Sequence, residues 1–387
     1  PGIVPEIGAS PRRPPAIATL NHAREMLRKR LVAPLLVWCD PLTYTALQEH
    51  APDFFDHYTA LFTFLDAAPE PQIVESEVKR PEPDVVARVV QRQVAASRAA
   101  VEFYEDQVAR LQEPTPERAR ALLGLAEALG QLSDAHVVSR LRRAENLTRE
   151  ALSLLSPERE KEEWARGQNT LGIILRNSPS GDRMENLRQA IACFEAALRV
   201  RTEAEFPYDW AATQNNLGNT YADLPSGDRA ENLRQAIACY EAALRVYTEA
   251  DFPQDWAMTQ NNLGTAYDNL SSGDRVENLR QAIACYQAAL RVRTEADFPQ
   301  NWANTQFNLG LTYSDLAAET NDFTLLRVAR ECFAMAERGY KSVGLVEHAA
   351  ETAHLQARVE AELAKRETKP SQRRQSRHKR DAVVKEA

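Results

Sequence analysis

The sequence predicts an all-α protein, a solenoid of stacked helical hairpins with a small α/β fragment at its N-terminus. Three observations carry this prediction. Tryptophan, glycine and glutamine recur at intervals of 46 residues, apolar side chains recur at helical spacing within each interval, and only 14 of 387 residues are glycine. A repeat of this length indicates units that bury their apolar faces against one another.

Each interval predicts two helices. In the second copy Trp210, Leu217 and Tyr221 share one helical face, and Leu233 and Tyr240 share the next. The second and third copies are almost identical, which indicates a recent duplication. The columns that define the array are Trp164, Trp210, Trp256 and Trp302; Gly172, Gly218, Gly264 and Gly310; and Cys193, Cys239 and Cys285.

The helix starts carry capping signals. Asp228 follows a Ser-Gly turn and has Glu231 three residues later, which is the aspartate version of a capping box. The same pair recurs as Asp182 with Glu185 and as Asp274 with Glu277. A proline favours the first turn of a helix, and one precedes each following tryptophan, at Pro207, Pro253 and Pro299.

These residues resemble the tetratricopeptide repeat (TPR) family. That family has Leu-Gly and an aromatic residue in the first helix, helix A, and an Ala-aromatic-Ala series in the second, helix B. The third copy supplies these as Leu263-Gly264, Tyr267, Ala282, Tyr286 and Ala289. The usual unit has about 34 residues, so these repeats are extended, and they resemble the extended repeats of bacterial STAND- and CHAT-associated signalling proteins. The match departs at Leu175, which lacks the aromatic ring, and over 319–324.

Weaker matches extend the array on both sides. Leu129-Gly130 is typical of a degenerate earlier copy, and residues 346–366 predict an amphipathic helix whose charged side chains suit an array end. The expected order is a disordered leader over 1–20, an α/β fragment over 21–68, a linker over 69–83, a long helix over 84–113, about five TPR-like repeats over 115–344, a capping helix over 345–366 and a disordered basic tail over 367–387.

The first 70 residues have a different character. Residues 33–39 form a short apolar run that predicts a buried strand, and Asp40 follows it. An aspartate there holds magnesium in some nucleotide-binding domains, but no GxxxxGK[ST] loop accompanies it, so we interpret Asp40 as an ordinary strand-end residue. Residues 20–58 resemble the end of the nucleotide-binding-like domain of STAND-type signalling proteins. This resemblance implies that the upstream half of such a domain is missing from the chain.

The formal charge of −8 is unevenly distributed. Residues 365–387 carry nine Lys/Arg against three Asp/Glu, a net of +6, which leaves −14 on the other 364 residues. An acidic body argues against a nucleic-acid partner, because phosphate binding needs a basic surface. The basic tail is the exception. Its composition suits contact with nucleic acid or an acidic partner, but we interpret it as a solvated, disordered end.

No pattern in the sequence indicates catalysis. The seven histidines form no HExxH or other close metal pair, and no GxSxG or Rossmann glycine pattern is present. We interpret the repeated cysteines as packing residues, because a catalytic thiol needs a unique electropositive site. We therefore expect no enzyme activity, no cofactor and no metal. The few cysteines, together with the lack of a signal peptide or an 18-residue apolar run, favour a cytoplasmic protein without a membrane partner.

The resemblance implies a binding surface. In TPR proteins helix A of each unit lines a concave groove, where polar side chains hold ligands. An asparagine row would suit an extended peptide, because an amide both donates and accepts hydrogen bonds. Alternatively, these asparagines bond neighbouring helices of the array. The expected partner-binding residues on the concave face are Asn169, Arg176, Asn215, Asn219, Asp223, Asn261, Asp268, Asn269, Phe307 and Asp315.

The sequence thus predicts a non-enzymatic scaffold that binds a protein or peptide partner on the concave face of its repeats. The alternative is that the chain is the sensor or regulatory arm of a larger STAND-type ATPase or CHAT-peptidase signalling protein. Neither the partner nor the oligomeric state follows from the residues.

Overall fold

The computed structural model describes residues 83–132, 136–225 and 227–385. The leader, the α/β fragment and most of the linker expected over residues 1–82 lie outside the described residues. All secondary structure within the described part is helical, in twelve helices, α4 to α15. Contacts divide the chain at Leu154 into two units, each of which packs as its own compact body.

The first unit contains α4 (Pro83–Arg110), α5 (Pro116–Gln131) and α6 (Val137–Ser153). A side chain added at Gly124 of α5 would clash with the ring of Tyr104 from α4. Gly130, the glycine that the sequence placed in the repeat pattern, has open space around it. The tightly packed glycine of this hairpin is therefore Gly124, and its ring comes from the preceding helix.

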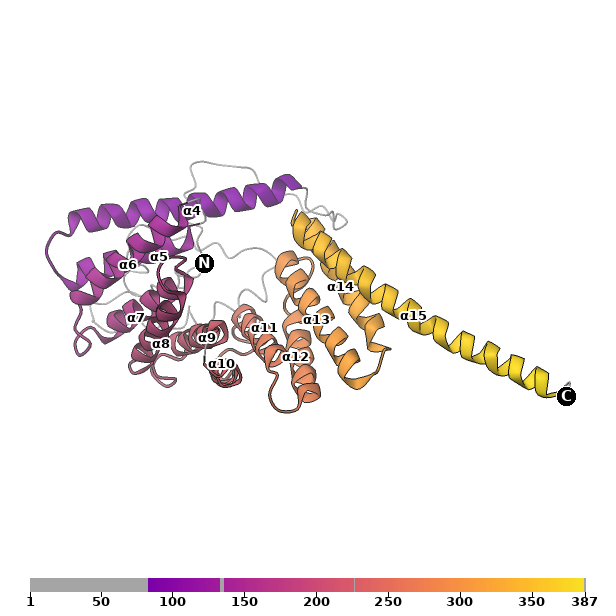
Figure 1. Ribbon diagram of the computed structural model, residues 1–387. Coiled ribbons are helices and arrows are strands. Elements are labelled where there is room, and N and C mark those ends of the chain that lie inside the picture. Colours follow the sequence, from indigo (N-terminus) through magenta and orange to yellow (C-terminus); the bar gives the residue numbers. More distant parts are fainter. Residues whose placement is uncertain (1–82, 133–135, 226, 386–387) are drawn as a thin grey trace, which may run out of the picture. The chain divides into compact units, whose positions relative to one another are not determined.

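The second unit is a series of hairpins in which each helix packs against the next, as in a TPR-type solenoid (Figure 1). Its helices are α7 (Lys161–Asn177), α8 (Arg183–Leu198), α9 (Pro207–Asp223), α10 (Arg229–Leu244), α11 (Pro253–Asn269), α12 (Arg275–Leu290), α13 (Pro299–Thr320), α14 (Leu325–Ser342) and α15 (Val346–Lys385).

The predicted helix starts are confirmed. The Asp228 side chain accepts hydrogen bonds from the backbone N–H groups of Ala230 and Glu231 at the start of α10. Asp182 and Asp274 cap α8 and α12 in the same way. Pro207, Pro253 and Pro299 each begin a helix, where the missing N–H costs nothing.

The core of this unit lies between successive hairpins. Leu233 and Tyr240 of α10 pack with Leu263 and Ala266 of α11 in one buried cluster. Leu233 is 1% exposed, so its side chain contributes about 1.5–3 kcal/mol relative to a solvated one. A hairpin without its neighbour would lose this burial, which explains why the units exist as an array.

The array curves with its odd-numbered helices on the inside. Each of α7, α9 and α11 contacts the next odd-numbered helix, whereas successive even-numbered helices have weaker contacts or none. Figure 1 shows α9, α11 and α13 on the inner side of the curve and α10 and α12 on the outer side. The surface formed by α7, α9, α11 and α13 is called the inner face below.

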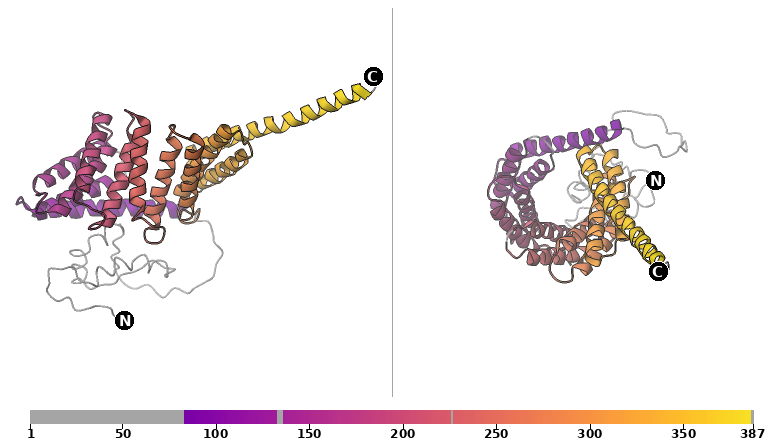
Figure 2. Two further views of the ribbon diagram at one scale, coloured as in Figure 1. Left: turned by 90° about the horizontal axis from the view of Figure 1, so that it is seen from below. Right: turned by 45° about the vertical axis from the view of Figure 1, so that its right-hand side comes forward.

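The array ends on α15. Its first turns pack against α14, and Val359 lies in a buried cluster with Phe333, Phe307 and Leu311. The helix then continues to Lys385, past the end of α14 (Figure 2). The sequence predicted a capping helix to 366 and disorder beyond it, and the structure has one continuous helix instead.

Candidate functional site on the inner face

The asparagine row on the inner face joins neighbouring repeats. The side-chain oxygen of Asn215 accepts hydrogen bonds from Thr259 Oγ1 at 3.3 Å and from Asn262 Nδ2 at 3.4 Å, both on the next inner helix. Asn169 accepts one from Asn216 at 3.3 Å, and Asn261 accepts one from Thr305 at 3.0 Å. Asn215 is only 4% exposed. These three side chains therefore carry out the alternative role considered above, which is to hold one helix against the next.

The row one turn further along the helices is linked to the framework through tyrosines. Asn219 accepts a hydrogen bond from Tyr240 Oη at 2.8 Å and another from Asn262 at 3.1 Å. In the third copy Thr265 replaces Asn219 and accepts one from Tyr286 at 3.1 Å. Asn219 and Thr265 thus accept a hydrogen bond from the corresponding tyrosine of their own repeats, although their side chains differ on the inner face.

Ion pairs cross the inner face at the ends of the odd-numbered helices. Asp223 lies 2.9 Å from Arg176 and 3.4 Å from Arg183. Two repeats further along, Asp315 lies 3.3 Å from Arg275. Each pair joins adjacent hairpins, but the groups are partly exposed, so each contributes at most about 1 kcal/mol to stability.

Asp268 and Asn269 take different partners. Asp268 accepts a hydrogen bond from Thr312 Oγ1 at 3.0 Å, and burial raises the pKa of its carboxyl above the ordinary value. Asn269 is exposed and donates to the backbone oxygen of Thr265 in its own helix, at 2.8 Å. It makes no bridge to the next repeat.

Phe307 stands 46 residues after Asn261, in the fourth position of the asparagine row, and has a different role from the asparagines. Its ring lies 6.0 Å from that of Phe333 and 6.4 Å from that of Tyr340, in edge-on arrangements. It packs in the cluster with Val359 and Leu355 of α15. An apolar ring suits this place because α15 offers aliphatic side chains where the other inner helices offer asparagine and threonine.

Comparison of the second and third copies separates framework from variable surface. Residues 206–251 and 252–297 differ at ten of 46 positions. The tryptophan, Leu-Gly, asparagine, cysteine and Ala-aromatic-Ala positions are all identical. Four of the ten differences lie along one stripe of the inner helix, as Ala212 and Met258, Asn219 and Thr265, Ala222 and Asp268, and Asp223 and Asn269.

The binding residues expected from the sequence do not include the first position of this stripe, Ala212 and Met258. Met258 is 37% exposed, and so is Ile173 on α7. These apolar side chains lie on helices whose other inner-face residues are mostly polar. The signal was present in the sequence as a difference between otherwise matching copies.

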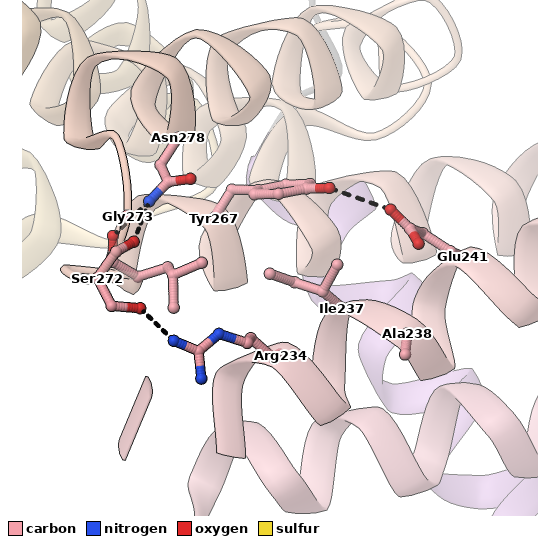
Figure 3. Close-up of a pocket in the computed structure, with 9 residues that line it drawn as sticks. Arg234, Ile237, Ala238, Glu241, Tyr267, Ser272, Gly273 and Asn278 are labelled. Atoms are coloured by element: carbon pink, nitrogen blue, oxygen red, sulfur yellow. Dashed lines mark hydrogen bonds between the residues drawn. The ribbon is translucent and has the colours of Figure 1, made fainter. Parts of the chain in front are cut away.

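The outer side has an open depression of about 380 Å³ between α10 and α11 (Figure 3). Ile237 and Leu270 line it, and its polar groups bond one another: Arg234 donates to Ser272 at 3.0 Å and Tyr267 donates to Glu241 at 3.0 Å. The corresponding residues of the preceding junction include Arg188, Ile191, Glu195 and Tyr221. Because the lining repeats and its polar groups are paired, it fits the framework better than a ligand site.

The repeated tryptophans and cysteines are framework residues too. Trp210 is 8% exposed, and the Arg245 guanidinium lies 5.0 Å from its ring centre while pairing with Glu203 at 2.7 Å. Burial raises the pKa of the Cys239 thiol to about 12, so it stays protonated at neutral pH. Burial raises the pKa of the Cys285 and Cys332 thiols in the same way.

The described residues contain no group of three His, Cys, Asp or Glu side chains arranged to hold a metal ion. None of the helices there combines the length and apolar character that crossing a membrane requires.

No family model matches the chain, and no curated protein matches its sequence. Among solved structures, BtubC (BKLC) from P. vanneervenii is 20% identical, with a TM-score of 0.42 over 71% of this chain and 92% of that chain. A Rap protein complexed with competence and sporulation factor is 14% identical, with a TM-score of 0.43 over 73% of each chain. The apo form of RapI is 14% identical, with a TM-score of 0.41 over 73% and 97%. Because these TM-scores lie below 0.5, the fold assignment rests on the chain's own hairpins.

Proposed function

We propose that this chain is a non-enzymatic interaction module whose inner face holds an extended peptide segment of a protein partner. One observation carries the proposal. Between two copies with the same framework, the stripe of the inner helix changes at four positions, whereas Asn215 and Asn261 and the threonines that bond them are identical. Both versions of the stripe occur on the same helical framework, so the stability of the fold does not explain the four differences.

The stripe has the chemistry of a peptide-binding surface. It presents an exposed Met258, the amide nitrogen of Asn219, and charged groups at its end. Such a mixture lets apolar contacts supply affinity while hydrogen bonds fix the register of an extended chain. Asn169, Asn215 and Asn261 support this surface from beneath, since their hydrogen bonds fix the spacing of the inner helices.

The experiment exchanges stripe residues between copies. A random decapeptide library displayed on phage is selected on the immobilised chain, and the selected peptides are measured by titration. The inner variant combines Ala212→Met, Asn219→Thr, Met258→Ala and Thr265→Asn, which leaves the composition unchanged. We expect it to lose about tenfold in affinity, ~1.4 kcal/mol.

The matched control exchanges an outer pair, Glu241→Gln with Gln287→Glu, in the same two copies. It should bind the selected peptides as the wild type does. Failure to select any peptide, or equal loss in both variants, would refute binding on the inner face. Circular dichroism of both variants establishes that the helices are retained.

A further inference from the structure

A row of three arginines marks the corners between the inner and outer helices of successive repeats. Arg183, Arg229 and Arg275 are the first residues of α8, α10 and α12. Each guanidinium donates through Nη1 to the backbone oxygen seven residues earlier, in Arg176, Ala222 and Asp268 respectively. The three side chains are therefore held in the same place relative to their own hairpins.

The first and third arginines reach a carboxylate in the next repeat. Nη2 of Arg183 lies 3.4 Å from Asp223, and Nη2 of Arg275 lies 3.3 Å from Asp315. Both carboxylates lie near the end of the following inner helix, 40 residues after their arginine. The guanidinium is thus shared between its own hairpin and the next one.

The middle arginine has no such carboxylate. The residue 40 positions after Arg229 is Asn269, whose amide turns back to Thr265. Arg229 is exposed, and its side chain donates only through Nη1, to Ala222 at 2.5 Å and to Leu224 at 3.2 Å. No Asp or Glu of the described chain lies within ion-pair distance of it.

The neighbourhood of Arg229 has also lost side-chain bulk and charge. Ala222 stands where the first copy has Arg176 and the third has Asp268. The gap therefore combines a fixed cation, a small neighbour and an uncharged amide, next to the variable stripe of the inner face. A fixed guanidinium with free donors binds a carboxylate in a planar, two-bond geometry.

We propose that Arg229 binds a carboxylate of the held segment, an Asp or Glu side chain, in the place that Asp223 and Asp315 fill at the neighbouring junctions. The proposal rests on the function proposed above and adds the chemical class of ligand at one position. Asn269 leaves this place open, because its uncharged amide donates to Thr265 of its own helix instead of pairing with Arg229.

The test uses the decapeptides selected on the wild-type chain. Their aligned sequences should share one Asp or Glu. Arg229→Gln should weaken the best peptide about fivefold, in keeping with an exposed charge-assisted contact. Asn269→Asp should weaken it by a similar factor, because the new carboxylate pairs with Arg229 as Asp223 does with Arg183. A peptide with Asn or Gln at the shared position should bind all three chains equally.

Arg234→Gln is the matched control, because Arg234 lies on the outer side and pairs with Glu231 and Ser272. It should not alter binding. Peptides without a shared acidic residue, or an Arg229→Gln variant that binds as tightly as the wild type, would overturn the carboxylate site while leaving peptide binding in place. If no peptide is selected, both proposals fall.

Discussion

The backbone of Gly218 lies against the ring of Tyr240, so close that a Cβ on Gly218 would be 2.8 Å from the ring atom Cε1. Gly264 meets Tyr286 and Gly310 meets Phe333 in the same way. The glycine and the aromatic ring are 22 residues apart in the second copy. Their contact fixes the distance between the two helices of a hairpin.

Gly218→Ala should therefore destabilise the array although alanine is the better helix former. The added methyl group meets the Tyr240 ring on one side and the Ala236 backbone oxygen, at 3.2 Å, on another. We expect a loss of about 1–3 kcal/mol in the free energy of unfolding, measured by urea denaturation followed by circular dichroism. Gly130→Ala is the control, because nothing lies near its added Cβ and it should be neutral or slightly stabilising. Equal effects in the two variants would contradict the packing argument.

Asn215→Ala should weaken the joint between α9 and α11. The change removes the acceptor that Asn262 and Thr259 share, although Asn262 keeps its hydrogen bond to Asn219. Losing a hydrogen-bond partner of the fully buried Thr259 costs about 1–3 kcal/mol, which should be visible as a lower urea midpoint. Asn177→Ala, at an exposed position on α7, should change the midpoint little. An Asn215→Ala variant with an unchanged urea midpoint would show that the inner helices are held by apolar contacts alone.

The array should lose stability at alkaline pH. Burial raises the pKa of Cys239, Cys285 and Cys332, and of the Tyr221 and Tyr267 hydroxyls, to about 12 in the folded state. Unfolding returns the thiols to about 8.5 and the phenols to about 10. Since the neutral forms are favoured by the fold, stability is full below about pH 8.5 and falls as the pH rises towards 12.

The urea midpoint measured between pH 8 and pH 11 checks this. The Cys239→Ala/Cys285→Ala variant should show a shallower fall with pH than the wild type, whatever its midpoint at pH 8. A midpoint that does not depend on pH over this range would contradict the assigned burial of the thiols.

One complete copy should be removable. Deleting residues 206–251 joins Glu205 to Phe252. Glu205 is followed by a phenylalanine in the intact chain too, and the deletion brings α8 against α11. The new junction reproduces the Trp, Leu-Gly and asparagine contacts of the old one. We expect a folded, shorter array whose melting temperature is lower by several degrees, because a nearest-neighbour interface is lost. Deletion of 23 residues from the same place, which removes half a hairpin, should abolish cooperative unfolding.

Much of the fold could be predicted from the sequence because its determinants are local or periodic. Asp228 caps a helix through backbone groups two and three residues away, and Pro207 begins one through its own fixed φ. The interval of 46 residues reveals the hairpins, since each carries the same apolar columns. Where the period fades, the prediction was less accurate: the glycine of α5 was assigned to Gly130 rather than Gly124, and α15 continues beyond the expected end.

The candidate site depended on contacts between repeats, which no local pattern contains. Asn215 and Asn219 look equivalent in the sequence, but one is buried in a ladder of hydrogen bonds and the other lies in a row that varies between copies. Phe307 occupies an asparagine column, yet packs towards α15.

By itself the sequence determined that this chain is an array of helical hairpins, because caps, turns and apolar periodicity act within one unit. The tertiary structure alone decided which polar side chains hold the array together. Those choices depend on groups 40 to 47 residues apart that meet only when the hairpins stack, as Arg176 and Arg183 both meet Asp223.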